Sequence, residues 1–395
     1  MELFSDLTVL SLEQATVLPY LTYRLAQDGA TVIRMEHPVY GDPNRMVGEP
    51  LPGEERMNQY YLCINSGKKA ITLNLGDPAG QELLDKLIVD LKVDIFATNQ
   101  LPKSYEKLGI TPERLRKVKP DLIWLGVTGF GPDVNEAAYD PILQARGGLM
   151  ELTGEAKGEP QVVGIPLPDM GTSEHAYCLL MKALYGREKT GQGATLNVSM
   201  FASTVSWLTV PITLTKSFGH KVTRRGNTHQ FFAPVSVFPT ADGFVYFAVG
   251  NDRQFASMVE MPEFAHLKKP EYQKNAGRIG DVENLNAAIT EVSKKFTSDE
   301  IIAKFNAIKL PISKIQNIEE LVEDPLVKPV LLKAKDAKSG LEITLAPPPH
   351  PTPFLKASNN TLSFPPRFGE HNAEIFGKVG VPEGDLPGMK GKGII

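Results

Sequence analysis

The sequence predicts an α/β protein with a doubly wound parallel sheet. Apolar runs of strand length alternate with helical patterns from residue 7 to residue 130, which is the order that strand–helix–strand units require. Two of the helical patterns begin with a capping residue followed by proline, at Asp77-Pro78 and Thr111-Pro112. The expected strands are 7–13, 30–36, 70–75, 93–99 and 121–130, and the expected helices are 20–29, 77–91 and 111–118.

A ligand is expected at the loops that follow these strands, because open parallel sheets bind ligands beyond the carboxyl ends of their strands. Taken singly, the basic residues in these regions are typical of a solvated surface, but together they indicate a phosphate-bearing ligand. They are Arg34, His37, Lys68, Lys69, Lys103 and Lys107. The glycines of GVTGFGP, residues 126–132, do not match the GxGxxG dinucleotide fingerprint.

The second half of the chain predicts a smaller α+β domain. A long apolar helical segment follows residue 199 and is expected to break at Pro211. The alternating run 235–250 predicts a hairpin with its turn at Asp242-Gly243, and helical patterns follow it at 252–260, 283–296 and 298–307. We therefore expect a large domain at 1–205, a linker at 206–227 and a small domain at 228–325. The segment 326–395 contains a second hairpin pattern and a proline-rich stretch with few core residues, so it is expected to return to the large domain.

Composition excludes several classes of protein. The 395 residues are 42% hydrophobic and 22% charged with a net charge of -4, which is typical of a globular protein and not of a nucleic-acid binder. The chain lacks an HExxH pair and a GxxxxGK[ST] loop, and no run of about 18 apolar residues predicts a membrane span. Glu2 and the absence of a basic leader argue against a signal peptide. Cys63 and Cys178 match no zinc or CxxC pattern, so buried thiols and a reducing, cytoplasmic location are expected.

Asp169 is the main candidate for chemistry, although its sequence context leaves two interpretations open. It lies between a strand-like run at 160–166 and a helical pattern that starts at 173, where a carboxylate stabilises the free amides of a helix N-terminus. Taken alone, the stretch favours this structural role. However, Thr172 and Ser173 lie closer to the helical pattern and are able to cap it themselves, and Gly171 permits close approach of a substrate. Asp169 is then available as a nucleophile or a base.

The chain resembles the class III CoA-transferase family, which includes formyl-CoA transferase and crotonobetainyl-CoA transferase, over nearly its whole length. The stretches that carry the resemblance are LAQDGATVIRMEHPVYGDPNR, NSGKKAITLNL, AYDPILQARGG, PDMGT, RRGNTHQFFAPVSVFPTADGFVYFAVGNDRQF and GEHNAEIF. No single stretch is decisive, but their order and spacing are specific. The resemblance implies a Rossmann-like large domain, a small domain and two subunits interlocked like chain links.

The resemblance also implies a role for Asp169. Its carboxylate would attack the donor thioester, giving an aspartyl-acyl anhydride and CoA thiolate, and the thiolate would then form an aspartyl-CoA thioester. An acceptor acid would reverse these steps and leave as its CoA ester. Glycine amides near residues 250–252, Gly250 above all, would stabilise the oxyanions.

The same resemblance implies a set of CoA-binding residues and no tightly bound cofactor or metal, with the CoA thioester acting as substrate. The set is Gln14, Ala15, His37, Leu73, Asn74, Leu75, Asn99, Lys107 and Tyr139. Several positions depart from the family pattern: His37 and Lys107 stand where arginine is frequent, Ala137 and Gly76 where lysine is, and NQLPKS replaces NFRPG. The phosphate and adenine contacts are therefore expected to differ from those of the family.

Tyr139 separates two of the functions that the resemblance allows. The racemase branch of the family exchanges a proton through a histidine in a GHD motif, whereas this chain has AYD with Tyr139. CoA transfer from an acyl-CoA such as succinyl-CoA to a small dicarboxylic or aromatic acid is therefore favoured over racemisation or epimerisation. A homodimer is expected. The remaining alternative is a non-catalytic CoA-binding subunit of a heteromeric transferase, against which the presence of Asp169 argues.

Overall fold

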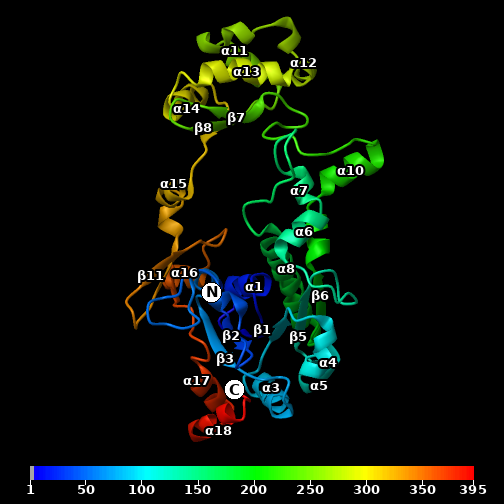
Figure 1. The fold of residues 1–395 in the computed structure, drawn as a ribbon, viewed down its shortest axis with the longest axis vertical. Helices are drawn as coiled ribbons and strands as arrows, with labels where there is room; N and C mark the ends of the chain where they lie inside the picture. Colours follow the sequence, from blue (N-terminus) through cyan, green and yellow to red (C-terminus); the bar gives the residue numbers. More distant parts are fainter. Residues whose placement is uncertain (1–3) are drawn as a thin grey trace. The chain divides into compact units, whose positions relative to one another are not determined.

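The computed structural model describes residues 4–395, and its contacts divide the chain into two compact units (Figure 1). The first unit takes in the chain up to residue 149, residues 162–219 and residues 329–395. The second unit takes in residues 150–161 and 220–328. Glu2, which argues against a signal peptide, lies outside the described residues. None of the described helices combines the length and the apolar character that a membrane crossing requires.

The first unit is built on a six-stranded parallel sheet within the described residues, so the predicted parallel α/β sheet is confirmed. Its strand order is β3-β2-β1-β4-β5-β6, and the order reverses between β1 and β4, which is the point where such sheets form a ligand crevice. The strands are β1 (Thr8–Leu12), β2 (Thr31–Glu36), β3 (Lys68–Thr72), β4 (Ile95–Thr98), β5 (Ile123–Thr128) and β6 (Thr195–Ser199).

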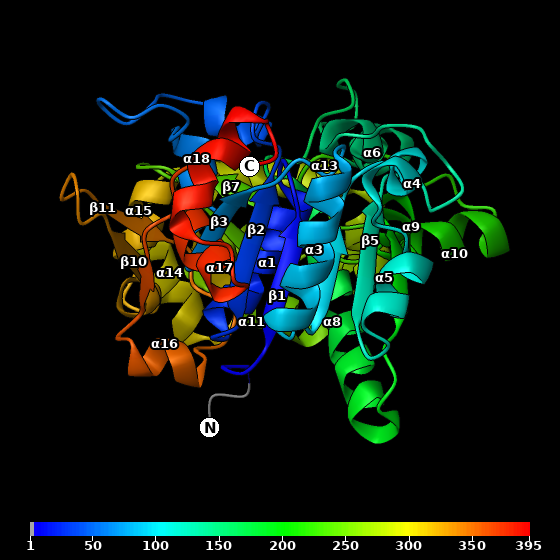
Figure 2. The same cartoon turned by 90° about the horizontal axis from the view of Figure 1, so that it is seen from below.

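Helices cover both faces of this sheet (Figure 2). Alternate strand residues point to opposite faces, so Leu10 packs with α3, α5 and α17, whereas Val9 packs with α1 and α8. The helices up to residue 219 are α1 (Val17–Gln27), α2 (Gln59–Leu62), α3 (Pro78–Asp90), α4 (Tyr105–Leu108), α5 (Pro112–Val118), α6 (Asp140–Arg146), α7 (Leu149–Leu152), α8 (Leu167–Thr190), α9 (Met200–Ser206) and α10 (Thr209–Phe218). Short 3-10 turns are η1 (Pro43–Met46) and η2 (Pro102–Ser104).

Three local predictions for this unit are wrong. Residues 160–166 form a loop instead of a strand, and α8 begins at Leu167, six residues before the expected start. Ser173 is therefore inside the helix and does not cap it, and its hydroxyl donates to the carbonyls of Asp169 and Val17. The apolar segment after residue 199 breaks at Trp207 and Leu208, because Pro211 lies in the first turn of α10, where proline is tolerated.

The second unit contains a three-stranded antiparallel sheet, ordered β7-β8-β9, among the residues described for it. The strands are β7 (Val235–Pro239), β8 (Phe244–Ala248) and β9 (Ile312–Lys314), so the predicted hairpin around Asp242-Gly243 is confirmed. The helices are α11 (Asp252–Val259), η3 (Pro262–Leu267), η4 (Pro270–Tyr272), α12 (Asn275–Gly280), α13 (Val282–Ser293), α14 (Ser298–Ala307) and α15 (Ile318–Glu323). Stacked aromatic rings of Phe238 and Phe247 and the neighbouring ring of Phe305 lie in its core.

Residues 329–395 belong to the first unit, where the helix at 372–378 packs against β3 and the segment 332–362 packs with Tyr23 of α1. Ile375 and Phe376 enter the core beside β3, and the backbone N–H of Asn74 donates to the carbonyl of Ile394 at 2.8 Å. The elements are η5 (Lys328–Val330), β10 (Leu332–Lys335), β11 (Glu342–Leu345), α16 (Pro353–Ala357), β12 (Thr361–Ser363), α17 (Asn372–Lys378), η6 (Glu383–Asp385) and α18 (Leu386–Gly391). Strands β10 and β11 pair antiparallel, which confirms the second hairpin.

The two cysteines differ from expectation. Cys63 and Cys178 are both free and exposed, so the prediction of buried thiols is wrong. Cys63 ends α2 and Cys178 lies within α8, and side chains near each of them in sequence are buried. The small apolar character of cysteine did not indicate which face of the helix it would occupy.

Candidate active site

The carboxyl ends of β1, β2, β3 and β4 enclose a cleft of about 200 Å³, which we name the strand-end cleft. Four of the predicted CoA-binding residues, Gln14, His37, Leu73 and Leu75, line it. The loops after four different strands therefore meet on the side of the sheet where a ligand was expected.

Three side chains fix the backbone of Gln14 and Ala15 at this cleft. Asn99 accepts from the N–H of Gln14 at 3.1 Å and donates to its carbonyl at 2.8 Å. Asp42 accepts from the N–H of Ala15 at 3.0 Å, and Asn44 donates to the carbonyl of Ala15 at 2.6 Å. These contacts hold Ala15 at a left-handed φ of 61°, which is costly for a residue other than glycine. The polar atoms of the Asn99 side chain are thus engaged with the protein itself.

A cluster of buried charges lies behind this loop. It contains Glu13, Glu36 and Asp42 with Arg34, Arg45 and Lys68, all of them at most 3% exposed. Arg34 pairs with Asp42 at 2.7 Å and Lys68 with Glu13 at 3.0 Å. Burial lowers the pKa of Lys68 to about 8. The interpretation of Arg34 and Lys68 as phosphate contacts is therefore wrong, because both are committed to internal carboxylates.

The other residues predicted to contact CoA or its phosphates differ in their exposure and in their partners. Lys107 is exposed on α4, whereas Lys69 pairs with Glu374. Asn74 donates through its side chain to the carbonyl of Gly393 at 3.1 Å, so it ties down the end of the chain. Burial lowers the pKa of His37, whose Nδ1 accepts from the N–H of Val39 at 3.1 Å.

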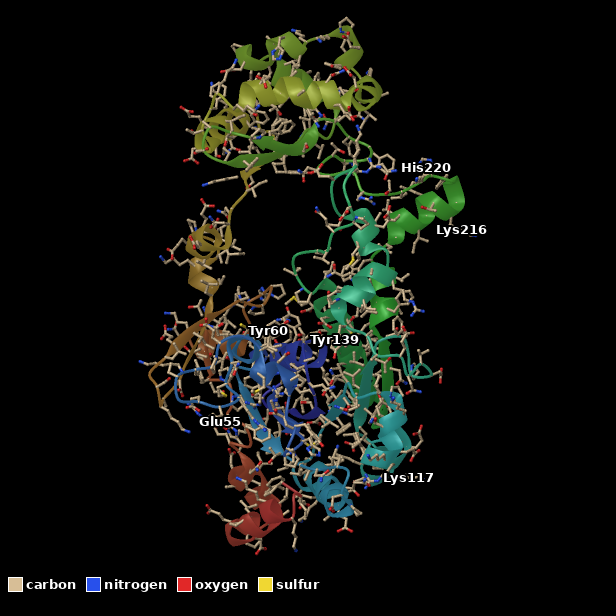
Figure 3. All side chains as sticks on the ribbon, in the orientation of Figure 1. Glu55, Tyr60, Lys117, Tyr139, Lys216 and His220 are labelled. Carbon is tan, nitrogen blue, oxygen red and sulfur yellow. The ribbon has the colours of Figure 1, made fainter. Side chains whose placement is uncertain are left out.

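Asp169 lies in a second cleft, of about 410 Å³, which we name the Asp169 cleft. It is formed by the start of α6, the loop 162–166 and the first turn of α8, together with Tyr60 and Tyr139. Figure 3 labels these two tyrosines. Asp169 is partly buried, and its backbone N–H donates to Asp140 Oδ2 at 3.1 Å. Burial, with the nearby charge of Asp140 as a smaller cause, raises the pKa of Asp169 to about 7.

Asp140 and Gln144 are site residues that sequence reasoning did not identify. Gln144 donates to Asp140 Oδ1 at 2.6 Å and accepts from the N–H of Val163 at 2.8 Å. Asp140 is 7% exposed, and burial raises its pKa. The available signal was their spacing of four residues in AYDPILQ, which places both side chains on one face of α6. Tyr139 stands at the N-cap position of α6 with its side chain 74% exposed.

Gly250 belongs to the second unit, between β8 and α11. Its N–H donates to Oε1 of Gln254 at 2.8 Å, so this amide already has a partner in the structure. Within residues 4–395, no group of three His, Cys, Asp or Glu side chains is arranged to hold a metal ion.

Comparison with known proteins defines the family. The family model described as CoA-transferase family III matches residues 4–372. The chain is 28% identical to human succinyl-CoA:glutarate CoA-transferase over 94% of this chain and 84% of that protein. It is 31% identical to acetyl-CoA:oxalate CoA-transferase of Acetobacter aceti, over 82% and 83% of the two chains. A crystal structure of a CAIB/BAIF family protein from Brucella suis has a TM-score of 0.80 at 28% identity, over 94% of this chain and 98% of that one.

The match over most of the chain shows that the protein belongs to CoA-transferase family III. It is an enzyme that transfers coenzyme A, with acyl-CoA and organic acids as its substrates.

Proposed function

We propose that the protein moves CoA from an acyl-CoA donor, such as succinyl-CoA, to a small dicarboxylic or aromatic acid through covalent intermediates on Asp169. The observation that carries this proposal is the position of Asp169. Its carboxyl is partly buried on an apolar cleft, and its pKa is raised to about 7. Nucleophilicity rises with basicity, so such a carboxylate attacks a thioester more readily than an ordinary aspartate once it is ionised. The names of relatives that use succinyl-CoA, glutarate or oxalate support an acyl-CoA donor and a dicarboxylic acid as the substrates.

The reaction proceeds in paired steps. The ionised Asp169 oxygen attacks the thioester carbonyl, the carbon–sulfur bond breaks, and CoA leaves as a thiolate from an aspartyl-acyl anhydride. The thiolate then attacks the aspartyl carbonyl of the anhydride, which releases the donor acid as a carboxylate and leaves CoA bound to Asp169 as a thioester. The acceptor carboxylate attacks this thioester and the same steps run backwards, which regenerates Asp169.

The protein contributes electrostatics and positioning to these steps. Asp140 holds the backbone of Asp169 and disfavours its charge, so attack on the thioester, which disperses that charge, relieves the repulsion. The resemblance makes the N–H of Gly250, which donates to Gln254 in the structure, the candidate oxyanion donor, and such donors typically contribute about 10²–10³ in kcat.

CoA lies in the strand-end cleft in this proposal. The adenosine and phosphate end contacts Gln14, Ala15, His37, Leu73, Asn74 and Leu75, with Lys107 at the exposed edge and Asn99 holding the loop. Tyr139 faces the reacting end on the Asp169 cleft. The large Rossmann-like domain at 1–205 thus binds CoA, and Gly250 belongs to the small domain at 228–325.

An interlocked dimer of the family kind completes the proposal. Helix α10 has no buried residue among the described ones, and Val210 and Ile212 on it are 57% and 46% exposed. A short helix that buries none of its apolar side chains gains little stability by itself. The exposed apolar side chains of α10 therefore support contact of this helix with a second subunit. A cytoplasmic location stays a prediction.

Chemical trapping tests the covalent role of Asp169. Incubation of the enzyme with an acyl-CoA and hydroxylamine should convert Asp169 to a hydroxamate that mass spectrometry locates in its peptide. An Asp169→Ala variant should lose transfer activity by at least about 10³-fold. The control variant Glu188→Ala, which removes an exposed carboxylate on the same helix α8, should keep its transfer activity. Full transfer by Asp169→Ala would contradict the mechanism.

Two further measurements address the alternatives. Reaction in deuterated water should leave the α-position of the product unlabelled, and rapid exchange there would favour a racemase. Transfer by the purified single chain is expected. A requirement for a second, different chain would favour the heteromeric subunit.

A further inference from the structure

The C-terminal segment of the chain contacts the outer edge of β3, which is an edge strand of the six-stranded sheet. On its inner side β3 pairs with β2, and the N–H of Leu73 continues this pairing by donating to the carbonyl of Glu36 at 2.9 Å. Because backbone amides alternate in direction along a strand, the amides of Thr72 and Asn74 point away from β2. Buried N–H groups on such an edge need partners from another part of the chain.

Residues 371–395, which we name the C-terminal edge segment, supply these partners. The N–H groups of Ala70, Thr72 and Asn74 donate in turn to Nδ1 of His371 at 3.2 Å, to Oδ1 of Asn372 at 2.9 Å and to the carbonyl of Ile394 at 2.8 Å. Nδ2 of Asn372 also donates to Oγ1 of Thr72 at 2.8 Å. Helix α17, which begins at Asn372, lies beside this edge in Figure 2. The outward amides at the end of β3 are therefore satisfied by residues that follow about 300 positions later in the chain.

The C-terminal edge segment also holds the loop 73–75 at the strand-end cleft. The two leucines of this loop line the cleft, and the side chain of Asn74 between them donates to the carbonyl of Gly393 at 3.1 Å. Ile394 and Ile395 are 8% and 5% exposed and pack in the same core cluster as these leucines. The position of this wall of the cleft thus depends on the last residues of the chain.

We propose that the C-terminal edge segment positions the loop 73–75 for CoA binding, with Asn372 and Ile394 as positioning residues of the transfer reaction. The segment fixes the backbone of the loop, and the loop in turn contacts the adenosine and phosphate end of CoA. This inference rests on the proposed function, which places CoA in the strand-end cleft. The effect falls on the affinity for CoA, because the chemistry takes place at Asp169 in the other cleft.

Substitution of Asn372 tests the inference in the whole enzyme. Asn372→Ala leaves the N–H of Thr72, a residue that is 4% exposed, without an acceptor. We expect the Kd of CoA, measured by titration calorimetry, and the KM of the acyl-CoA to rise at least about fivefold, while kcat stays within about twofold of the native value. Asn372→Asp keeps an oxygen at the acceptor position and should restore both constants to within about twofold of the native values. His371→Ala removes the acceptor of Ala70 and should act in the same direction as Asn372→Ala.

Thr352→Ala is the matched control for a general loss of stability. Thr352 also precedes a helix in the C-terminal part of the chain, where its hydroxyl donates to the carbonyl of Gln27 at 2.7 Å and accepts from the N–H of Leu355 at 3.2 Å. The variant should lower the unfolding temperature and leave the Kd of CoA unchanged. A native Kd in Asn372→Ala, or an equal rise of the Kd in Thr352→Ala, would overturn the inference.

Hydrogen–deuterium exchange of the peptide that contains residues 70–76 locates the effect. In the native enzyme CoA should slow exchange of the amides 73–75, and without CoA these amides should exchange at least about tenfold faster in Asn372→Ala. The amides of β5 are the internal reference and should keep their native rates. If CoA left the exchange of 73–75 unchanged in the native enzyme, the proposed CoA position would fail together with this inference. If CoA slowed exchange in the loop while Asn372→Ala kept native rates, this inference alone would fail.

Discussion

The carboxylate of Asp140 accepts a hydrogen bond from the backbone N–H of Asp169 at 3.1 Å, while burial holds the pKa of both carboxyls above the ordinary value for aspartate. The two residues come from the starts of α6 and α8, so the contact joins two helix N-termini. Asp140 thereby has two effects on Asp169: it positions its backbone and it disfavours its negative charge.

The pH dependence of acylation follows from this pair. Because only the ionised Asp169 attacks, kcat/KM for the acyl-CoA donor should rise with pH through about 7. Burial is the main cause of the raised pKa of Asp169, and Asp140→Asn removes the smaller cause, the nearby charge, so the acid limb of this variant should lie at lower pH than that of the native enzyme. A full pH–rate profile checks this. Asp133→Asn, on an exposed loop, is the matched control and should leave the limb in place; an unmoved limb in Asp140→Asn would contradict the coupling.

The raised pKa of Asp169 also predicts a stability cost. The folded-state pKa of about 7 exceeds the unfolded value of 3.8, so the native protein loses stability as pH rises between these two values. Asp169→Asn removes this loss. It should raise the free energy of unfolding at pH 8 by about 1–3 kcal/mol, with little effect of this kind near pH 4. Urea unfolding at both pH values measures the difference, and a variant less stable than the native protein at pH 8 would contradict the assigned environment.

The sequence was sufficient to predict the parallel sheet, because each strand–helix pattern is local and the capping signals at Asp77 and Thr111 hold in the structure. The meeting of the strand-end loops at one cleft could also be predicted, because the carboxyl ends of parallel strands lie at the same edge of the sheet. Strand β6 was missed, because its short pattern after Gly193 is separated from the other strands by α8.

The errors at the candidate site have a common physical cause. Whether Arg34 and Lys68 face solvent or buried acceptors depends on residues far along the chain: Glu13 is 55 residues from Lys68, and Asn65 is 31 residues from Arg34. The roles of Asp140 and Gln144 likewise depend on the loop 162–166, which has no regular pattern of its own. Through-space pairing of polar groups leaves no periodic signal in a single sequence.

The loop at Gln14 offers a prediction about CoA affinity. Asn99→Ala leaves the N–H and the carbonyl of Gln14 without their partner, so the loop should lose its fixed conformation. We expect KM for the acyl-CoA to rise about tenfold with a smaller change in kcat, and stability to fall by about 1–2 kcal/mol. Asn135→Ala, which also removes an acceptor from a backbone N–H but on an exposed loop, should leave KM unchanged. A fall in kcat at constant KM would instead indicate that Asn99 acts on the chemical step.

The packing of Gly80 against the backbone of Asn74, between two residues that line the strand-end cleft, predicts a coupled loss of stability and binding. A Cβ at Gly80 would lie 2.0 Å from the carbonyl oxygen of Asn74, so α3 approaches the loop 73–75 more closely than any other residue type allows. Gly80→Ala should push this loop away, with a cost of about 2–3 kcal/mol in unfolding free energy and a higher KM for the acyl-CoA. Gly186→Ala is the matched control in a helix, since a Cβ there meets no atom within 4 Å, and it should stabilise by about 0.5–1 kcal/mol with no change in KM. If Gly80→Ala were stabilising like Gly186→Ala, α3 would not be what holds Leu73 and Leu75 at the cleft.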